Sequence, residues 1–131
     1  MMISKKFFYF AWLHREQVAK KLAELNLFIG QDLFLMLLHE CEELSQKEIT
    51  EKLQVEYPTV TKMTSRLVQR GFVLKKSHTT DLRVSMVSLT DKGRAVCATL
   101  QAIWRESEQQ LTHRLTPEEV KHLSELLNKL K

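Results

Sequence analysis

The chain has 131 residues, of which 44% are hydrophobic and 27% charged, with only 3 Gly and 2 Pro. This composition predicts one helix-rich domain over residues 1–131. The sequence contains no repeat of fixed period, so a solenoid is not expected. The apolar run of residues 7–13 lacks a small-residue cleavage site, and no segment approaches the ~18 apolar residues of a membrane span. Two cysteines, Cys41 and Cys97, are too few for a disulfide framework, so we expect a cytoplasmic protein without a membrane partner.

Positive charge is concentrated in one third of the sequence. The net charge of the chain is +4, and residues 57–94 carry eight basic and two acidic side chains, a net +6 against −2 in the remainder. The basic residues are Lys62, Arg66, Arg70, Lys75, Lys76, Arg83, Lys92 and Arg94. Such a segment indicates either a surface that binds a polyanion or a solvated basic face, and charge alone does not separate the two.

The first half of the chain predicts three helices. Residues 5–27 place apolar side chains at helical spacing, and Gly30 separates them from a second, strongly apolar helix over residues 31–44. Its density of Leu, Phe and Met makes that second helix the expected centre of the core. Ser45 and Glu48, three residues apart, form a capping box that opens a short third helix.

A fourth helix and a β-hairpin follow. Pro58 suits the first turn of this helix, and Gly71 suits the position just past its end. Residues 72–76 and 83–89 are rich in β-branched and apolar side chains, which predicts two strands joined by the polar residues 77–82.

Two further helices complete the predicted order. Thr90 and Asp91 open a helix of about residues 92–111, and Thr116 with Glu119 forms a second capping box that opens the last helix. The apolar residues of the last helix recur close to the 3.5-residue period. They are Val120, Leu123, Leu126, Leu127 and Leu130. We interpret this seam as a contact between two copies of the chain.

The fourth helix has two unlike faces. The buried face is expected to consist of Val60, Met63, Thr64 and Leu67. The opposite face carries Pro58, Lys62, Ser65 and Gln69, flanked by Thr61 and Arg66. Hydroxyl and amide side chains reach base edges, and Lys and Arg reach guanine acceptors or phosphates, so this face suits the major groove of DNA.

These elements together predict a mostly α-helical fold, a winged helix-turn-helix with a two-stranded β-hairpin wing. We expect such a protein to bind duplex DNA. The alternative from another class is a winged-helix module that binds proteins and no DNA. We expect no enzyme and no cofactor, because the chain has no glycine-rich phosphate loop and no recognisable nucleophile–base pair.

Residues 44–96 resemble the multiple-antibiotic-resistance regulator (MarR) family of bacterial transcription factors. The most specific features are Asp81 and Arg83 of the hairpin and the sequence VSLTDKG at residues 87–93. The resemblance implies dimerisation helices at about residues 1–30 and 100–131 and a winged helix-turn-helix at about residues 31–99. It also implies a homodimeric regulator of pseudo-palindromic operators, most often a repressor, that is released by a small molecule or by oxidation.

The resemblance also implies which residues contact DNA. On the fourth helix these are Pro58, Thr59, Thr61, Lys62, Ser65 and Arg66. On the hairpin they are Lys75, Lys76, Ser77, His78, Asp81 and Arg83, with Asp81 orienting Arg83 toward the minor groove. Gln46 is expected to contact a phosphate. The chain departs from the family pattern at Leu82, where many relatives have a second arginine, and at Glu56, where a serine or asparagine cap is usual.

Three further hypotheses compete with simpler structural interpretations. Cys41 stands among glutamates and lacks the cations that activate a thiolate, which favours an ordinary cysteine over an oxidant sensor. The cluster at residues 39–43 lacks a partnering i,i+4 histidine pair, so we expect no metal site. Four aromatic residues indicate either a pocket for a small aromatic effector or, preferentially, core and dimer contacts: Phe8, Phe10, Trp12 and Trp104.

Overall fold

The computed structural model describes residues 2–131, which form six α-helices and three short strands. The helices are α1 (Ile3–Glu24), α2 (Gln31–Cys41), α3 (Gln46–Leu53), α4 (Tyr57–Gln69), α5 (Asp91–Thr112) and α6 (Pro117–Asn128). The strands are β1 (Glu43–Ser45), β2 (Val73–Ser77) and β3 (Ser85–Leu89). Over residues 2–131 no helix combines the length and the apolar character needed to cross a membrane.

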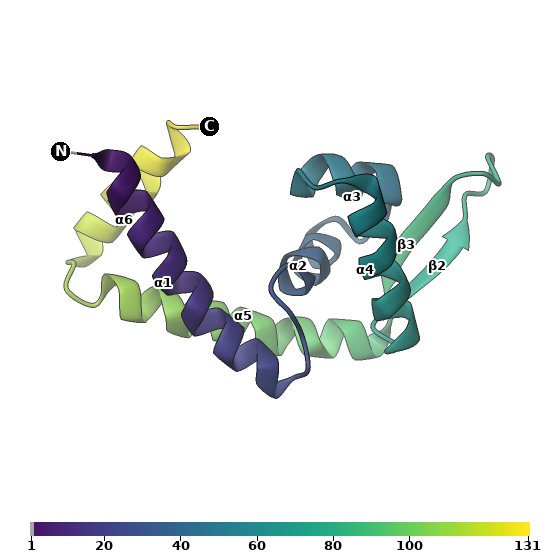
Figure 1. Cartoon of the computed structure of the whole chain (residues 1–131), viewed down its shortest axis with the longest axis horizontal. Coiled ribbons are helices and arrows are strands. Elements are labelled where there is room, and N and C mark those ends of the chain that lie inside the picture. Colours follow the sequence, from purple (N-terminus) through teal and green to yellow (C-terminus); the bar gives the residue numbers. More distant parts are fainter. Residues whose placement is uncertain (1) are drawn as a thin grey trace.

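Figure 1 shows two arms joined by the long helix α5. One arm contains α2, α3, α4 and the β2–β3 hairpin, and the other contains the N-terminal half of α1 together with α6. Helix α1 crosses α5 on its way toward the first arm, and both chain ends lie on the second arm. This arrangement separates the predicted DNA-contacting elements from the predicted dimerisation helices.

Helix α2 lies at the centre of the core, as its composition predicts. Phe34, Leu35 and Leu38 are fully buried, and they join Leu22 of α1 and Leu100 of α5 in one hydrophobic cluster. Each such side chain contributes roughly 1.5–3 kcal/mol by leaving water. The core therefore holds the first arm firmly onto the middle of α1 and α5.

The sheet has three strands: the predicted hairpin is present as β2–β3, and β1, which was not predicted, adds a third strand beside β3. Residues 43–45, expected to end the second helix and open the third, form β1, which pairs antiparallel with β3 and places Leu44 opposite Val87. Glu42 has a φ of 66°, so α2 stops at Cys41 and the chain turns into the strand. Burial of Leu44 and Val87 stabilises the pairing, a long-range contact that helical periodicity does not reveal.

The predicted helix boundaries rest on capping groups that the structure contains. Ser45 and Thr116 each accept a hydrogen bond from the backbone three residues on, and Glu48 and Glu119 complete the two capping boxes. Gly71 has a φ of 78° and follows the last turn of α4, where a residue in the left-handed region normally ends a helix.

Gly93 brings the first turn of α5 against the segment between α4 and β2. A Cβ atom at this position would lie 2.1 Å from the carbonyl oxygen of Phe72, a backbone atom that itself accepts a hydrogen bond from the Thr90 N–H at 3.0 Å. The position therefore requires glycine although its backbone is helical.

We predict that Gly93→Ala destabilises the protein by about 1–3 kcal/mol, because the added carbon forces backbone apart in a packed region. Thermal or urea unfolding measures the change. The sign is diagnostic, since Gly→Ala inside a helix ordinarily stabilises by up to about 1 kcal/mol. A stabilised variant would contradict the close contact.

Candidate nucleic-acid interface

The inward face of α4 fixes the direction of its outward face. Val60, Thr64 and Leu67 are fully buried and Met63 is half-buried, which confirms the predicted buried face. The hydroxyl of Thr64 donates to the carbonyl oxygen of Val60 at 2.7 Å, so this buried polar group is satisfied within the helix. Rotation of α4 about its axis would expose these side chains and is therefore unfavourable.

The outward face of α4 presents small polar side chains and cations to solvent. The exposed residues are Pro58, Thr59, Lys62, Ser65 and Arg66. Thr61 is half-buried, and its hydroxyl donates to the Tyr57 carbonyl oxygen at 3.1 Å. Glu56 precedes the helix without a capping hydrogen bond from its side chain. The predicted contact residues of α4 thus lie together on one face, with Thr61 at its border.

The connection between β2 and β3 holds Arg83 in place through Asp81. Arg83 donates from Nε to Asp81 Oδ1 at 3.2 Å, and its backbone N–H donates to the same oxygen at 3.1 Å. The Arg83 side chain remains 92% exposed. The Arg83 side chain and backbone lower the pKa of the Asp81 carboxyl, so Asp81 is ionised at neutral pH and orients the guanidinium as predicted.

The remaining hairpin residues divide between solvent and the fold. His78 is half-buried, and its Nδ1 accepts from the backbone N–H groups of Thr80 at 3.1 Å and Asp81 at 3.3 Å. His78 therefore shapes the turn. Lys75, Lys76 and Ser77 are exposed, and Lys76 Nζ lies 3.8 Å from a carboxylate oxygen of Glu43 on β1.

Gln46 does not join the exposed set, which corrects the expected phosphate contact of its side chain. It is only 4% exposed, and its Oε1 accepts a hydrogen bond from the Tyr57 hydroxyl at 3.1 Å. The pair bridges the first turns of α3 and α4. Sequence reasoning missed Tyr57, although its position directly before Pro58 places it at the start of the fourth helix.

Three of the eight basic residues counted between positions 57 and 94 serve the fold. Arg70 donates to backbone carbonyls of the α1–α2 connection, Lys92 donates to the carbonyl oxygen of Arg70 at 2.8 Å, and Arg94 pairs with Asp91. The other five are exposed on α4 and the hairpin: Lys62, Arg66, Lys75, Lys76 and Arg83. The positive segment is thus partly a binding face and partly structural.

The two cysteines differ in their exposure to solvent. Cys97 is fully buried, its thiol donates to the Leu35 carbonyl oxygen at 3.4 Å, and burial raises its pKa, so it is held as a thiol. Cys41 is exposed. Within residues 2–131 no group of three or more His, Cys, Asp or Glu is arranged to hold a metal ion.

A cavity of about 160 Å³ lies between α1, α2 and α5, and one of the four predicted aromatic residues lines it. Trp104 stacks edge-on against His14 at 4.8 Å and donates from Nε1 to Asp32 Oδ2 at 3.0 Å. Phe8, Phe10 and Trp12 lie elsewhere, with 51% to 73% of their surface exposed. They do not line this cavity, so of the four aromatic residues Trp104 is the one that a ligand in the cavity would contact.

A short capped helix, an outward polar helix and a cationic hairpin define the winged helix-turn-helix class. The MarR family model matches residues 29–85. The chain is 36% identical over 84 residues to the multiple antibiotic resistance protein MarR of Escherichia coli strain K12. It is 36% identical over 78 residues to the organic hydroperoxide resistance transcriptional regulator of Bacillus subtilis strain 168. These matches cover 63% and 60% of the chain and 58% and 53% of the two relatives, little more than half their length.

The fold extends the likeness over nearly the whole chain. A crystal structure of an E. coli MarR mutant in complex with operator DNA superimposes with a TM-score of 0.86 at 26% identity, covering 98% of this chain and 92% of that one. The DNA-free mutant gives 0.87 at 25% identity and covers 99% and 96% of the two chains. The chain is therefore similar to the MarR family in sequence over residues 29–85 and in fold over nearly its whole length.

Proposed function

We propose that this protein is a homodimeric, sequence-specific DNA-binding regulator of transcription, a repressor that a small-molecule effector releases from its operator. The observation that carries this proposal is the exposed polar face of α4 beside the exposed Arg83. The operator complex of the E. coli relative supports it, since that chain shares the same fold. Occupation of a promoter by the dimer would exclude the transcription machinery.

The side chains suggest a division of labour on DNA. Lys62 and Ser65 are of types that reach base edges when a helix enters the major groove, and Arg66 beside them is suited to a phosphate. Arg83, held by Asp81, is suited to the narrow minor groove, where guanidinium groups are attracted by the enhanced negative potential. In a two-fold dimer the two copies of α4 would read half-sites about one duplex turn, ~34 Å, apart.

We predict that the protein retards duplex DNA in a mobility-shift assay and that this binding depends steeply on salt. Five exposed cations per protomer allow a dimer to neutralise roughly 6–10 phosphates, which lowers affinity by about 10³–10⁵ between 50 and 200 mM salt. Random duplexes test the non-specific part, and duplexes selected by the protein from a random pool test the specific part. Absence of retardation at low salt would instead favour a winged-helix module that binds proteins.

Substitutions distinguish backbone contacts from base contacts. Arg83→Ala should weaken binding to every sequence, whereas Lys62→Ala or Ser65→Ala should change which duplexes are selected. Lys121→Ala, an exposed cation on α6, removes the same charge far from α4 and serves as the matched control. Equal losses for Arg83→Ala and Lys121→Ala would contradict the proposed wing contact.

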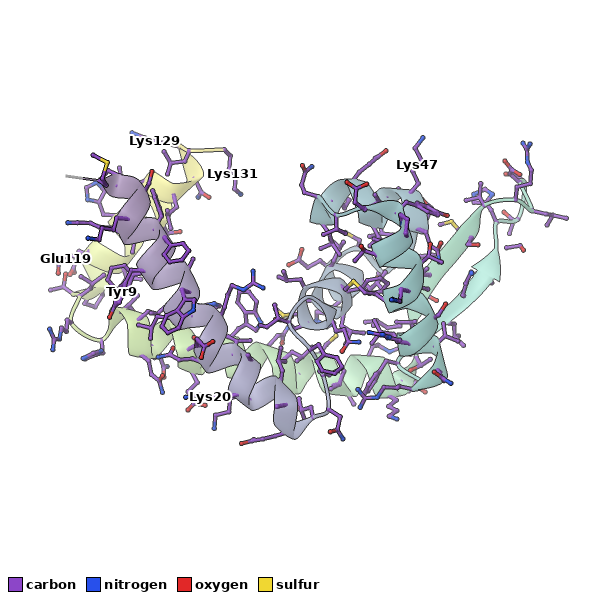
Figure 2. All side chains as sticks on the ribbon, in the orientation of Figure 1. Tyr9, Lys20, Lys47, Glu119, Lys129 and Lys131 are labelled. Carbon is purple, nitrogen blue, oxygen red and sulfur yellow. The ribbon has the colours of Figure 1, made fainter. Side chains whose placement is uncertain are left out.

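The second arm supports dimerisation because it leaves apolar side chains uncovered. None of the residues of α6 is buried, although this helix carries the leucine seam, and Leu123, Leu126 and Leu127 are 41% to 45% exposed. In Figure 2 the labelled Tyr9, 55% exposed, lies on this arm, far from Lys47 on α3. A helix of 12 residues is marginal in water without packing. A second copy would cover this surface.

We predict that Leu127→Glu converts the dimer to monomer, because the substitution places an unpaired charge in the apolar contact. Sedimentation equilibrium measures the change. Lys121→Glu, on the opposite side of α6, should leave the dimer intact. If wild-type protein sediments as a monomer at micromolar concentration, the dimer proposal fails.

The cavity lined by Trp104 supports a site for the effector. Besides Trp104 and His14, its lining includes the guanidinium-bearing Arg15. Its volume of about 160 Å³ is below the ~300–1,000 Å³ of sites for larger ligands, which favours a single aromatic ring. An aromatic acid would stack on the two rings and place its carboxylate near Arg15.

We predict that benzoate-class acids quench the fluorescence of Trp104 and weaken DNA retardation over the same concentration range. The Trp12→Phe background isolates the signal of Trp104, and Trp104→Phe in the same assay should abolish the DNA effect. Retardation unchanged at 10 mM acid, well above the ~1 mM dissociation constants of weak ligands, would exclude this effector class.

A further inference from the structure

The C-terminal ends of α1 and α4 are joined by one side chain, that of Arg70. Helix α1 ends in a Schellman motif, in which the Leu27 N–H donates to Leu22 O at 2.9 Å and the Asn26 N–H to Ala23 O at 3.0 Å. Asn26 adopts the left-handed region with a φ of 56°. The motif uses the carbonyls of the preceding turn and leaves those of Leu25 and Asn26 directed away from the helix.

Arg70 takes up both of these carbonyls. Its Nη2 donates to Leu25 O at 2.9 Å and its Nη1 donates to Asn26 O, across a separation of 45 and 44 residues in sequence. The guanidinium thus lies at the C-terminal, negative end of α1, where a cation is favoured by the helix dipole. Two donors in a fixed planar fork restrict orientation as well as distance.

Helix α5 holds the same residue from its other side. Lys92 Nζ, in the first turn of α5, donates to the carbonyl oxygen of Arg70 at 2.8 Å. The ring of Phe72 contacts both cations, with the Arg70 guanidinium carbon 5.0 Å and Lys92 Nζ 4.8 Å from its centroid. Arg70, which directly follows α4, is therefore connected to the C-terminal end of α1 and to the first turn of α5.

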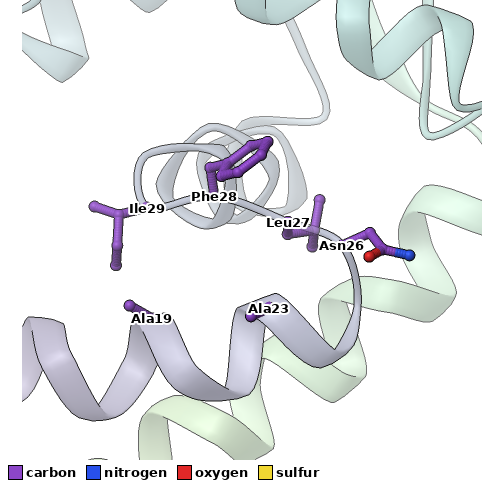
Figure 3. Close-up of a pocket in the computed structure, with 6 residues that line it drawn as sticks. All are labelled: Ala19, Ala23, Asn26, Leu27, Phe28 and Ile29. Atoms are coloured by element: carbon purple, nitrogen blue, oxygen red, sulfur yellow. The ribbon is translucent and has the colours of Figure 1, made fainter.

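The α1–α2 connection packs on the core through Leu27, with Leu25 and Ile29 against it, and its polar link to the end of α4 is made by Arg70. Figure 3 shows Asn26, Leu27 and Phe28 on one side of a hollow, with Ala19 and Ala23 of α1 on the other. The volume of this hollow is about 600 Å³. Asn26 and Phe28 are exposed, and only Leu27 is buried. The two hydrogen bonds from Arg70 are thus the specific polar link between this connection and α4.

We propose that Arg70 is a positioning residue that fixes α4 relative to α1 and α5 and thereby sets the half-site spacing that the dimer accepts. The inference rests on the DNA-binding function proposed above. In a dimer assembled through α1, α5 and α6, the distance between the two copies of α4 depends on how each is attached to this frame. Arg70 supplies that attachment without contacting DNA.

The DNA test uses duplexes that the wild-type dimer selects from a random pool. Arg70→Ala should lower affinity about tenfold, the ratio that corresponds to two hydrogen bonds of ordinary net strength. For this variant, the slope of the logarithm of the DNA-binding constant against the logarithm of the salt concentration should equal that of wild type. Arg66→Ala, an exposed arginine of the same helix, should reduce the slope by about 0.9 for each lost phosphate contact. Arg70→Lys keeps the charge but has a single nitrogen in place of the two that bind the carbonyl oxygens, and it should recover part of the affinity.

Half-site spacing gives the second readout on DNA. One base pair inserted between the selected half-sites should penalise wild type more than Arg70→Ala, because the variant holds α4 less rigidly. A salt slope that falls in Arg70→Ala as it does in Arg66→Ala would make Arg70 a phosphate contact and overturn the proposal. Unchanged affinity with unchanged spacing preference would also overturn it.

A measurement without DNA separates this inference from the DNA-binding proposal. Spin labels at Lys20→Cys on α1 and Ser65→Cys on α4, in a Cys41→Ser background diluted with unlabelled protein, report the distance between the two helices within one chain. Arg70→Ala should broaden or shift this distance distribution relative to the parent. If the distribution is unchanged, the proposal is wrong even where the protein binds DNA; if it changes in a protein that selects no duplex, the attachment stands and the DNA function fails.

Discussion

One joint between α4, the hairpin and α5 positions the proposed binding face of this chain. Within residues 71–93 the Phe72 carbonyl oxygen accepts from Thr90, the Thr90 hydroxyl donates to the Gly71 carbonyl oxygen, and Gly93 allows the first turn of α5 to approach. The joint connects the end of α4 and the start of β2 with the end of β3 and the start of α5. The wing and the end of α4 are therefore joined to the long helix through hydrogen bonds that the Phe72 and Gly71 carbonyl oxygens accept from Thr90.

Local signals predicted most of the helices and one face of α4. Ser45 and Thr116 cap helices through atoms three residues away, and Gly71 ends α4 because its backbone adopts a positive φ. Such features depend on neighbours in sequence and can be read from it. The buried face of α4 was predictable for a related reason, since burial of Val60 and Leu67 follows the helical period.

The features that sequence reasoning missed all depend on distant partners. Strand β1 forms because Leu44 finds Val87, and Gln46 is buried because Tyr57 covers it. Arg70 was counted as one more cation of a basic segment, whereas its partners lie 44 and 45 residues earlier in the chain. A count of charges carries no information on which cation reaches a carbonyl and which reaches solvent. Pairing of this kind has to be observed in three dimensions.

The division of the basic segment has a consequence for how binding can be altered. Cations such as Lys62 and Arg83 face solvent, so their removal changes the electrostatic contribution to affinity and its dependence on salt. Arg70 and Lys92 face carbonyl oxygens and the Phe72 ring, so we expect their removal to change the geometry of α4. Each of these substitutions removes one positive charge, as removal of Lys62 or Arg83 does. Affinity and geometry therefore reside in different members of one charged stretch. Substitutions of identical charge within residues 62–92 should separate into two classes, one that changes the salt dependence of binding and one that changes the spacing of the sites bound.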